Sequence, residues 1–90
     1  MFFLYILWSE SAGRFYIGNT KNMPARLAHH NAGGTPSTKS FRPWKLVYIE
    51  TFGTLHEARK REKQIKSWKN PSYMVRVLGI DTKKPIDIIL

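Results

Sequence analysis

The chain has 90 residues, with 15 Lys and Arg against 6 Asp and Glu, which gives a formal charge of +9 at pH 7. Such a positive excess on a small chain points to a polyanionic partner, most often nucleic acid. The sequence has no cysteine, which excludes a disulfide framework, a thiolate metal site and a cysteine nucleophile. The same absence agrees with a cytoplasmic location.

The length predicts one domain over residues 1–90, whose 42% hydrophobic content can fill a small core. An apolar run opens the chain at residues 2–8. It has no cationic leader or cleavage site and is too short to span a bilayer. We therefore expect a strand buried on both faces and no membrane partner. The oligomeric state stays open, with a monomer favoured.

Turn-forming residues at 9–13 separate this run from a second short strand at residues 14–18, and the pair predicts a hairpin. Asn22 is expected to cap a helix that has Pro24 in its first turn and ends at a pair of glycines. The next stretch, residues 35–43, has the composition of a loop.

Residues 44–52 are rich in β-branched and aromatic side chains and predict the third strand. Thr54 and Glu57 form a capping box at the start of a long basic helix. Pro71 can begin a short helix that Gly79 closes, and the apolar end of the tail is expected to pack on the sheet or on another chain. The order β-β-α-β-α-α predicts an α/β fold of the α+β kind, in which helices flank a small three-stranded antiparallel sheet.

One position of the long basic helix breaks its pattern. Leu55, Ala58, Ile65 and Trp68 form the inward apolar stripe, and Glu62 occupies the missing place in it. A carboxylate on an apolar face needs either a cationic partner or a metal ion. The helix pattern alone does not choose between an ion pair with an Arg or Lys from elsewhere in the fold and a metal ligand.

The hairpin carries two tyrosines, Tyr5 and Tyr16. They share a face of the sheet if a four-residue turn at residues 9–12 pairs them, and a five-residue turn would place them on opposite faces. Cross-strand packing is the ordinary explanation for such a pair.

Arg26 and His30 are four residues apart on the first predicted helix and point the same way, whereas His29 is expected to turn away from Arg26. Arginine clamps phosphate oxygens and histidine carries protons near neutral pH, although a solvated helix face explains the pair equally well. A carboxylate, two tyrosines, an arginine and a histidine in a basic chain together suit metal-assisted phosphodiester hydrolysis.

These residues resemble the GIY-YIG nuclease superfamily. The likeness rests on Leu4-Tyr5-Ile6 and on Tyr16-Ile17-Gly18, and it continues through Thr20, Asn22, Arg26, His30-Asn31 and the stretches 42–48 and 58–68. It covers residues 2–69 and is greatest with the small standalone bacterial members. Phe3 and Leu4 replace the Gly-Ile of the naming motif, and Asn19 stands where many relatives carry a cation or a small residue. Asn70 is the nearest candidate for the family's downstream Asn.

The resemblance implies a role for each matching position. Tyr5 and Tyr16 would line the site, and one of them would help to activate the attacking water. Arg26 would hold the scissile phosphate, and His30 would assist proton transfer or steady a tyrosine. Glu62 would be the protein ligand of one Mg²⁺ or Mn²⁺ ion. We expect these side chains to converge in one shallow concavity.

The implied function is that of a metal-dependent endonuclease that hydrolyses phosphodiester bonds in DNA, including branched or single-stranded substrates. DNA is favoured over RNA as the partner. The alternative is a nucleic-acid-binding module that keeps the fold without turnover. The basic residues expected to contact nucleic acid are Lys39, Arg42, Arg59, Lys63 and Lys66.

Overall fold

The computed structural model describes residues 1–87. Its elements are β1 (Phe2–Ser9), β2 (Arg14–Thr20), α1 (Met23–Asn31), α2 (Pro36–Lys39), β3 (Lys45–Phe52), α3 (Leu55–Ser67) and α4 (Pro71–Leu78). The strands form a three-stranded sheet in the order β2-β1-β3, and both pairings are antiparallel. The predicted α+β fold, with helices around a small antiparallel sheet, is confirmed.

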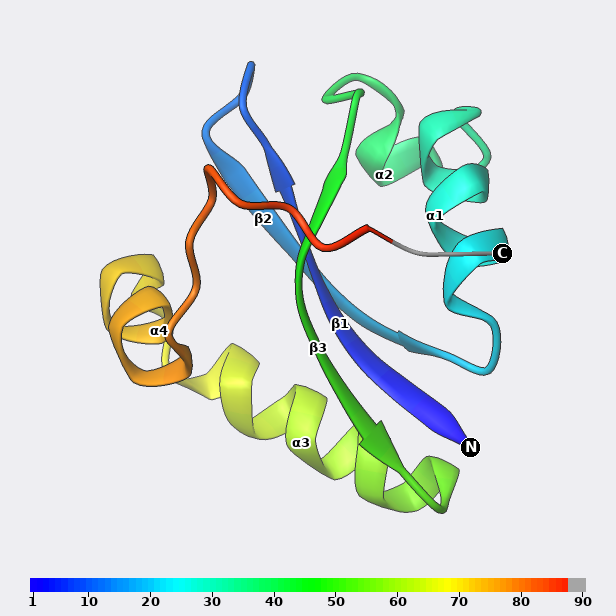
Figure 1. Ribbon diagram of the computed structural model, residues 1–90, viewed down its shortest axis with the longest axis vertical. Helices are drawn as coiled ribbons and strands as arrows, with labels where there is room; N and C mark the ends of the chain where they lie inside the picture. The colour runs from blue at the N-terminus through cyan, green and yellow to red at the C-terminus, as the bar shows by residue number, and fades with distance from the viewer. Residues whose placement is uncertain (88–90) are drawn as a thin grey trace.

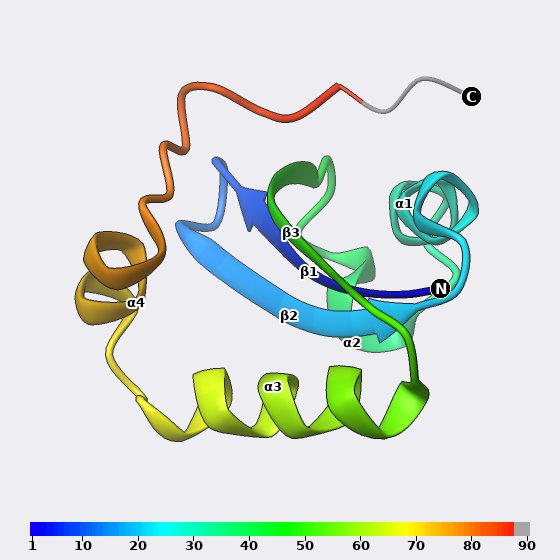
Figure 2. The same ribbon diagram turned by 60° about the horizontal axis from the view of Figure 1, so that its bottom comes forward.

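The sheet lies between two layers of helices. Helices α3 and α4 lie on one side, and α1 and α2 lie on the other (Figures 1 and 2). Since side chains alternate along a strand, Leu4 and Ile6 enter the apolar cluster beneath α3 and α4, whereas Tyr5 and Leu7 enter the cluster beneath α1. All four are at most 1% exposed, so the expected burial of β1 on both faces is confirmed.

A β-bulge interrupts the pairing of β1 with β3. Ile6 pairs with Tyr48 and Leu7 pairs with Leu46, which leaves Val47 as the extra residue. Val47 and its neighbour Tyr48 therefore both pack in the cluster on the α3 side, although they are adjacent in sequence.

Polar side chains cap the helices as the sequence predicts. Asn22 accepts a hydrogen bond from the Ala25 N–H at the start of α1. Thr54 accepts from the Glu57 N–H at the start of α3, and its hydroxyl donates to the Glu57 carboxylate. Helix α4 begins at Pro71 and ends at Leu78. Gly79 caps it with a φ of 68°, the left-handed conformation that glycine adopts without strain.

The expectation that residues 35–43 are loop throughout is wrong for Pro36–Lys39, which form α2. Pro36 fixes a helical φ in the first turn, and the N–H groups of Thr38 and Lys39 both donate to the Thr35 carbonyl. A helix of this length shows no periodic apolar pattern, so the sequence could not reveal it.

The tail returns to the sheet through one backbone hydrogen bond, from the Ile86 N–H to the Leu46 carbonyl at 2.8 Å. Part of the tail therefore packs on the sheet, and residues 88–90 of the predicted apolar end lie outside the described residues. Within residues 1–87, no helix is long and apolar enough to cross a membrane.

Candidate active site

A buried hydrogen bond joins β1 to α1. The hydroxyl of Tyr5 lies 3.1 Å from Nε2 of His30, and these residues are 1% and 0% exposed. His30 is inside because Met23, Leu27 and His30 follow the helical spacing that turns one face of α1 to the sheet. Arg26, one turn before His30, lies at the rim of that face and is exposed. The two side chains therefore leave the helix in similar directions but end in different environments.

The second ring nitrogen of His30 has its own partner, and this partner fixes the tautomer. Nδ1 lies 2.9 Å from Oγ1 of Thr38, whose hydroxyl donates to the Thr35 carbonyl at 3.2 Å. Because the Thr38 proton is used there, Oγ1 accepts from Nδ1–H. Nε2 then carries no proton and accepts the hydroxyl proton of Tyr5. The chain of donors runs from Tyr5 through His30 and Thr38 to the backbone.

The surroundings keep both members of the buried pair neutral. Burial, followed by the nearby Tyr16, raises the pKa of the Tyr5 hydroxyl well above its usual value near 10. Burial, followed by the electrostatic influence of the nearby Arg26 and His29, lowers the pKa of His30 below its usual 6.5. A neutral phenol that donates to a neutral imidazole is the state that both shifts favour.

Tyr16 lies on the same face of the sheet as Tyr5. Its ring centroid is 4.7 Å from that of His30 and 6.2 Å from that of Tyr5. The four-residue turn at residues 10–13 pairs Tyr5 with Gly18 and Leu7 with Tyr16, so the tyrosines are diagonal neighbours and not a direct pair. Tyr16 is only half-buried, and its ring is the more accessible of the two.

Gly18, opposite Tyr5, has no room for a side chain. A Cβ built there would lie 2.6 Å from the Tyr5 hydroxyl oxygen and 3.2 Å from Cε1 of Tyr16. Glycine within a strand often marks such a close approach. Gly18 belongs to the Tyr16-Ile17-Gly18 motif, and the structure gives this glycine a role that the sequence analysis does not assign to it.

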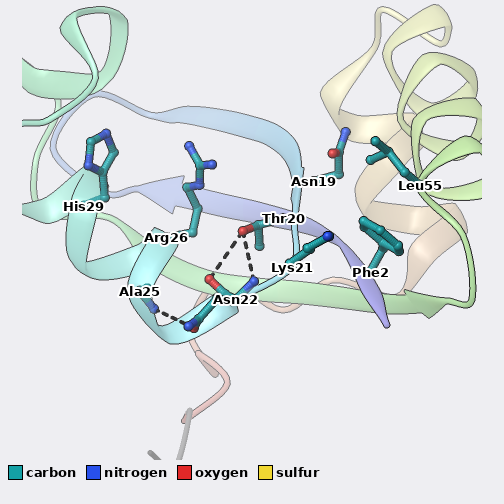
Figure 3. A pocket seen from close by; sticks show the side chains of 9 residues that line it. All are labelled: Phe2, Asn19, Thr20, Lys21, Asn22, Ala25, Arg26, His29 and Leu55. Carbon is teal, nitrogen blue, oxygen red and sulfur yellow. Dashed lines mark hydrogen bonds between the residues drawn. The ribbon is translucent and has the colours of Figure 1, made fainter.

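Arg26 lines a cavity of about 550 Å³, whose lining includes neither Tyr5 nor Tyr16 (Figure 3). His29 lines it too, so the expectation that His29 turns away from Arg26 is wrong: residues three apart on a helix are surface neighbours. Arg26 is the member of the predicted catalytic set among the lining residues. The positive charge of Arg26 also acts on the buried pair. Burial lowers the pKa of His30, and Arg26 adds to that effect. Burial and Tyr16 raise the pKa of Tyr5, and Arg26 opposes that rise.

Glu62 lies on α3, and its side chain is 19% exposed. One oxygen accepts from Nδ2 of Asn19 on β2 at 2.5 Å, and the other pairs with Nζ of Lys66 at 2.5 Å. The Lys66 side chain is 54% exposed, so this is a surface ion pair within one helix. Glu62 therefore contacts the edge strand β2 through Asn19, on the face of the sheet that α3 covers, whereas Tyr5 enters the cluster on the other face.

The donor chemistry at Glu62 fits a hard divalent cation. In residues 1–87 no group of three or more His, Asp or Glu side chains could hold a metal ion, so Glu62 would act as a single protein carboxylate. Magnesium often binds through one or two carboxylates together with water and substrate phosphate. The exposed ammonium of Lys66 would have to leave the carboxylate first.

The residues expected to contact nucleic acid form two groups on opposite sides of the sheet. Lys39 and Arg42 lie together beside Gly33, and the Arg42 Nε donates to the Lys39 carbonyl. The others are exposed on α3, namely Arg59, Lys63 and Lys66. The structure therefore does not bring the two groups onto one face, and Lys66 is engaged by Glu62.

Two polar side chains elsewhere have structural partners. Arg61 pairs with Glu50 of β3 at 3.0 Å and so connects α3 to the sheet. Asn70, the candidate for the family's downstream Asn, caps α4 by accepting from the Tyr73 N–H.

The layered sheet and its tyrosine pair define the class of protein. The GIY-YIG catalytic domain matches residues 1–74, and the chain belongs to the GIY-YIG family. Among its relatives, a UPF0213 protein of Staphylococcus haemolyticus (strain JCSC1435) is 50% identical over 54 residues, covering 59% of this chain and 66% of that protein. A UPF0213 protein of Staphylococcus epidermidis (strain ATCC 12228) is 45% identical over 67 residues, covering 73% and 80%. The solution NMR structure of a UPF0213 protein from Bacillus halodurans matches with a TM-score of 0.55 and 26% identity, covering 88% of this chain and 84% of that one.

Proposed function

We propose that this protein is a metal-dependent endonuclease that hydrolyses phosphodiester bonds in DNA. The observation that carries the proposal is the exposed guanidinium of Arg26, one turn before the buried His30, which packs on the Tyr16 ring and which Tyr5 and Thr38 hold in one tautomer. A fixed set of polar groups next to a phosphate clamp is the arrangement that electrostatic catalysis requires.

The tyrosines have different roles in this proposal. Tyr5 is buried and donates to His30, so its hydroxyl is committed to the protein. Tyr16 is partly accessible, and we assign to it the contact with the attacking water. His30 steadies the Tyr16 ring, and Arg26 binds the scissile phosphate through charge-assisted hydrogen bonds.

Glu62 would hold one Mg²⁺ or Mn²⁺ ion, which would supply charge stabilisation at the leaving oxygen. Asn19 holds the Glu62 carboxylate at the edge strand, and it orients the free oxygen once Lys66 has moved away. The family membership supports this assignment, since the matched catalytic domain includes Glu62.

The test is incubation of the purified protein with labelled single-stranded, duplex and branched DNA, in Mg²⁺ and in chelator. We expect metal-dependent cleavage that Arg26→Ala and Glu62→Gln abolish. Lys60→Gln is the matched control, because Lys60 is exposed on the same helix and is not among the residues expected to contact nucleic acid. Circular dichroism of each variant separates loss of chemistry from loss of fold. No cleavage of any substrate by the folded wild-type protein would contradict the proposal.

One observation favours the alternative, a nucleic-acid-binding module without turnover. Both oxygens of Glu62 already have protein partners, Asn19 and Lys66, so the carboxylate is satisfied without a metal. This alternative predicts DNA binding that is unchanged by Mg²⁺ and yields no product. The same gels, run beside a binding titration, distinguish the two functions.

A further inference from the structure

The cavity beside Arg26 contains side chains that the proposed reaction does not use. Its volume of about 550 Å³ is within the range of small-ligand sites, roughly 300–1,000 Å³. Figure 3 shows Arg26 and His29 rising from α1 on one side of it, with Phe2 and Leu55 on the other. The lining consists of Phe2, Asn19, Thr20, Lys21, Asn22, Ala25, Arg26, His29 and Leu55.

The polar lining divides into groups that bond to each other and groups that do not. The Thr20 hydroxyl bonds to the backbone of Asn22, and the Asn22 side chain caps α1, so these two form a fixed wall. In the part of the chain that the structure describes, the side chains of Lys21, Arg26 and His29 make no hydrogen bond or ion pair. No carboxylate is among the lining residues. Three side chains with unused hydrogen-bond donors in one cavity favour an anionic ligand.

The remaining part of the lining is apolar and flat. Phe2 is partly exposed, and Leu55 begins α3 beside it. The Lys21 ammonium lies over the Phe2 ring, 5.2 Å from its centroid, and both side chains line the cavity. Proteins that bind single-stranded nucleic acid combine an aromatic ring, on which a base stacks, with cationic side chains that contact the phosphates.

We infer that this cavity binds an unpaired nucleotide of the substrate strand, with its base stacked on Phe2 and its phosphate contacted by Lys21. The inference rests on the proposed function, which supplies the nucleic-acid substrate and the scissile phosphate that Arg26 binds. The incoming base displaces the Lys21 ammonium from the ring, and the flexible lysine then reaches the phosphate. A base inside a duplex is covered by its neighbours, so the cavity favours single-stranded or frayed DNA over continuous duplex.

The experiment compares two short ligands in chelator at one fixed, low salt concentration. One is a thymidine hexanucleotide, and the other is a hexamer of abasic sites with the same phosphates. Because one stacked base contributes about 1–3 kcal/mol, the wild-type protein should bind the thymidine ligand at least about fivefold more tightly. Phe2→Leu, which keeps an apolar side chain, should remove most of that preference. Tyr73→Leu, at an exposed aromatic on α4, should leave it intact.

A second measurement uses the unaltered protein and so does not depend on how Phe2→Leu folds. In two-dimensional NMR, the thymidine hexanucleotide should shift the amide signals of Thr20 and Lys21 and the ring signals of Phe2, and the abasic hexamer should leave the ring signals in place. Equal affinity for the two ligands, or shifts confined to Lys39 and Arg42, would overturn the inference. Base-dependent binding without any cleavage would instead remove the proposed function and leave the inference standing.

Discussion

Replacing Thr38 by valine tests the hydrogen-bond chain that fixes His30. Valine keeps the shape of threonine and removes the hydroxyl that accepts from Nδ1 at 2.9 Å. Thr38 is 1% exposed and His30 is 0% exposed, so water cannot replace the lost acceptor without opening the structure. The imidazole must either leave Nδ1–H unsatisfied or move its proton to Nε2 and lose the hydrogen bond from Tyr5.

Either outcome leaves a buried polar group without a partner, which costs about 1–3 kcal/mol. For a domain of this size, each kcal/mol lowers the melting temperature by about 4–8 °C. We therefore expect Thr38→Val to melt at least about 4 °C below the wild type. Thr38→Ser is the matched control, because it keeps the hydroxyl and should recover most of the loss.

The direct assay is the ¹⁵N NMR signature of the His30 ring, which distinguishes protonated Nδ1 from protonated Nε2. The wild type and Thr38→Ser should carry the proton on Nδ1 near neutral pH. A wild-type ring with its proton on Nε2 would refute the derivation, since Tyr5 could then not be the donor. An unchanged melting temperature in Thr38→Val would show that this hydrogen bond contributes nothing measurable to stability.

Four further outcomes follow from the structure. Gly18→Ala should lower stability by about 1–3 kcal/mol, because its Cβ would lie 2.6 Å from the buried Tyr5 hydroxyl; an unchanged melting curve would contradict this. The lowered pKa of His30 means that the unfolded chain binds the proton first, so stability should fall as the pH drops below about 6.5 and level off below the folded pKa. Melting curves of His30→Gln should lack that part of the slope. Glu62→Gln should abolish cleavage. It should lower stability by only about 0.2–1 kcal/mol, because the side chain of its partner Lys66 is 54% exposed. A loss of about 3 kcal/mol with cleavage intact would end the metal-ligand assignment. If binding neutralises about four to six phosphates, the affinity for duplex DNA should fall with salt with a log-log slope of roughly −4 to −5, and a flat response would exclude a polyanion.

Local patterns were sufficient to predict most of the fold. The caps at Asn22 and Thr54 and the apolar run of β1 depend on neighbouring residues, and the structure agrees with each. The relation between Tyr5 and Tyr16 depends on the length and position of one turn, which local patterns do not fix. The turn has four residues, so the tyrosines share a face, but it lies at residues 10–13 and not at 9–12, so they are not directly paired.

The site was less predictable, because its contacts join residues far apart in the chain. Thr38 lies in a stretch with loop composition, and only the packing of α2 against α1 brings it to His30. Asn19 departs from the family pattern, and its hydrogen bond to Glu62 spans 43 residues and has no local signal in the sequence. The catalytic roles of these side chains remain predictions, since they depend on a reaction and not on a contact.

The burial of Tyr5 on the central strand also affects where conformational entropy is lost. β1 has a partner strand on each side, so the Tyr5 ring is ordered when the sheet forms. Little ordering of this ring or of the His30 ring is then left to occur when a ligand arrives. The conformational entropy that is lost on binding comes instead from long exposed side chains such as Arg26 and Lys21, which a ligand would order. The amide of Tyr5 should accordingly be among the slowest in hydrogen exchange, with or without nucleic acid.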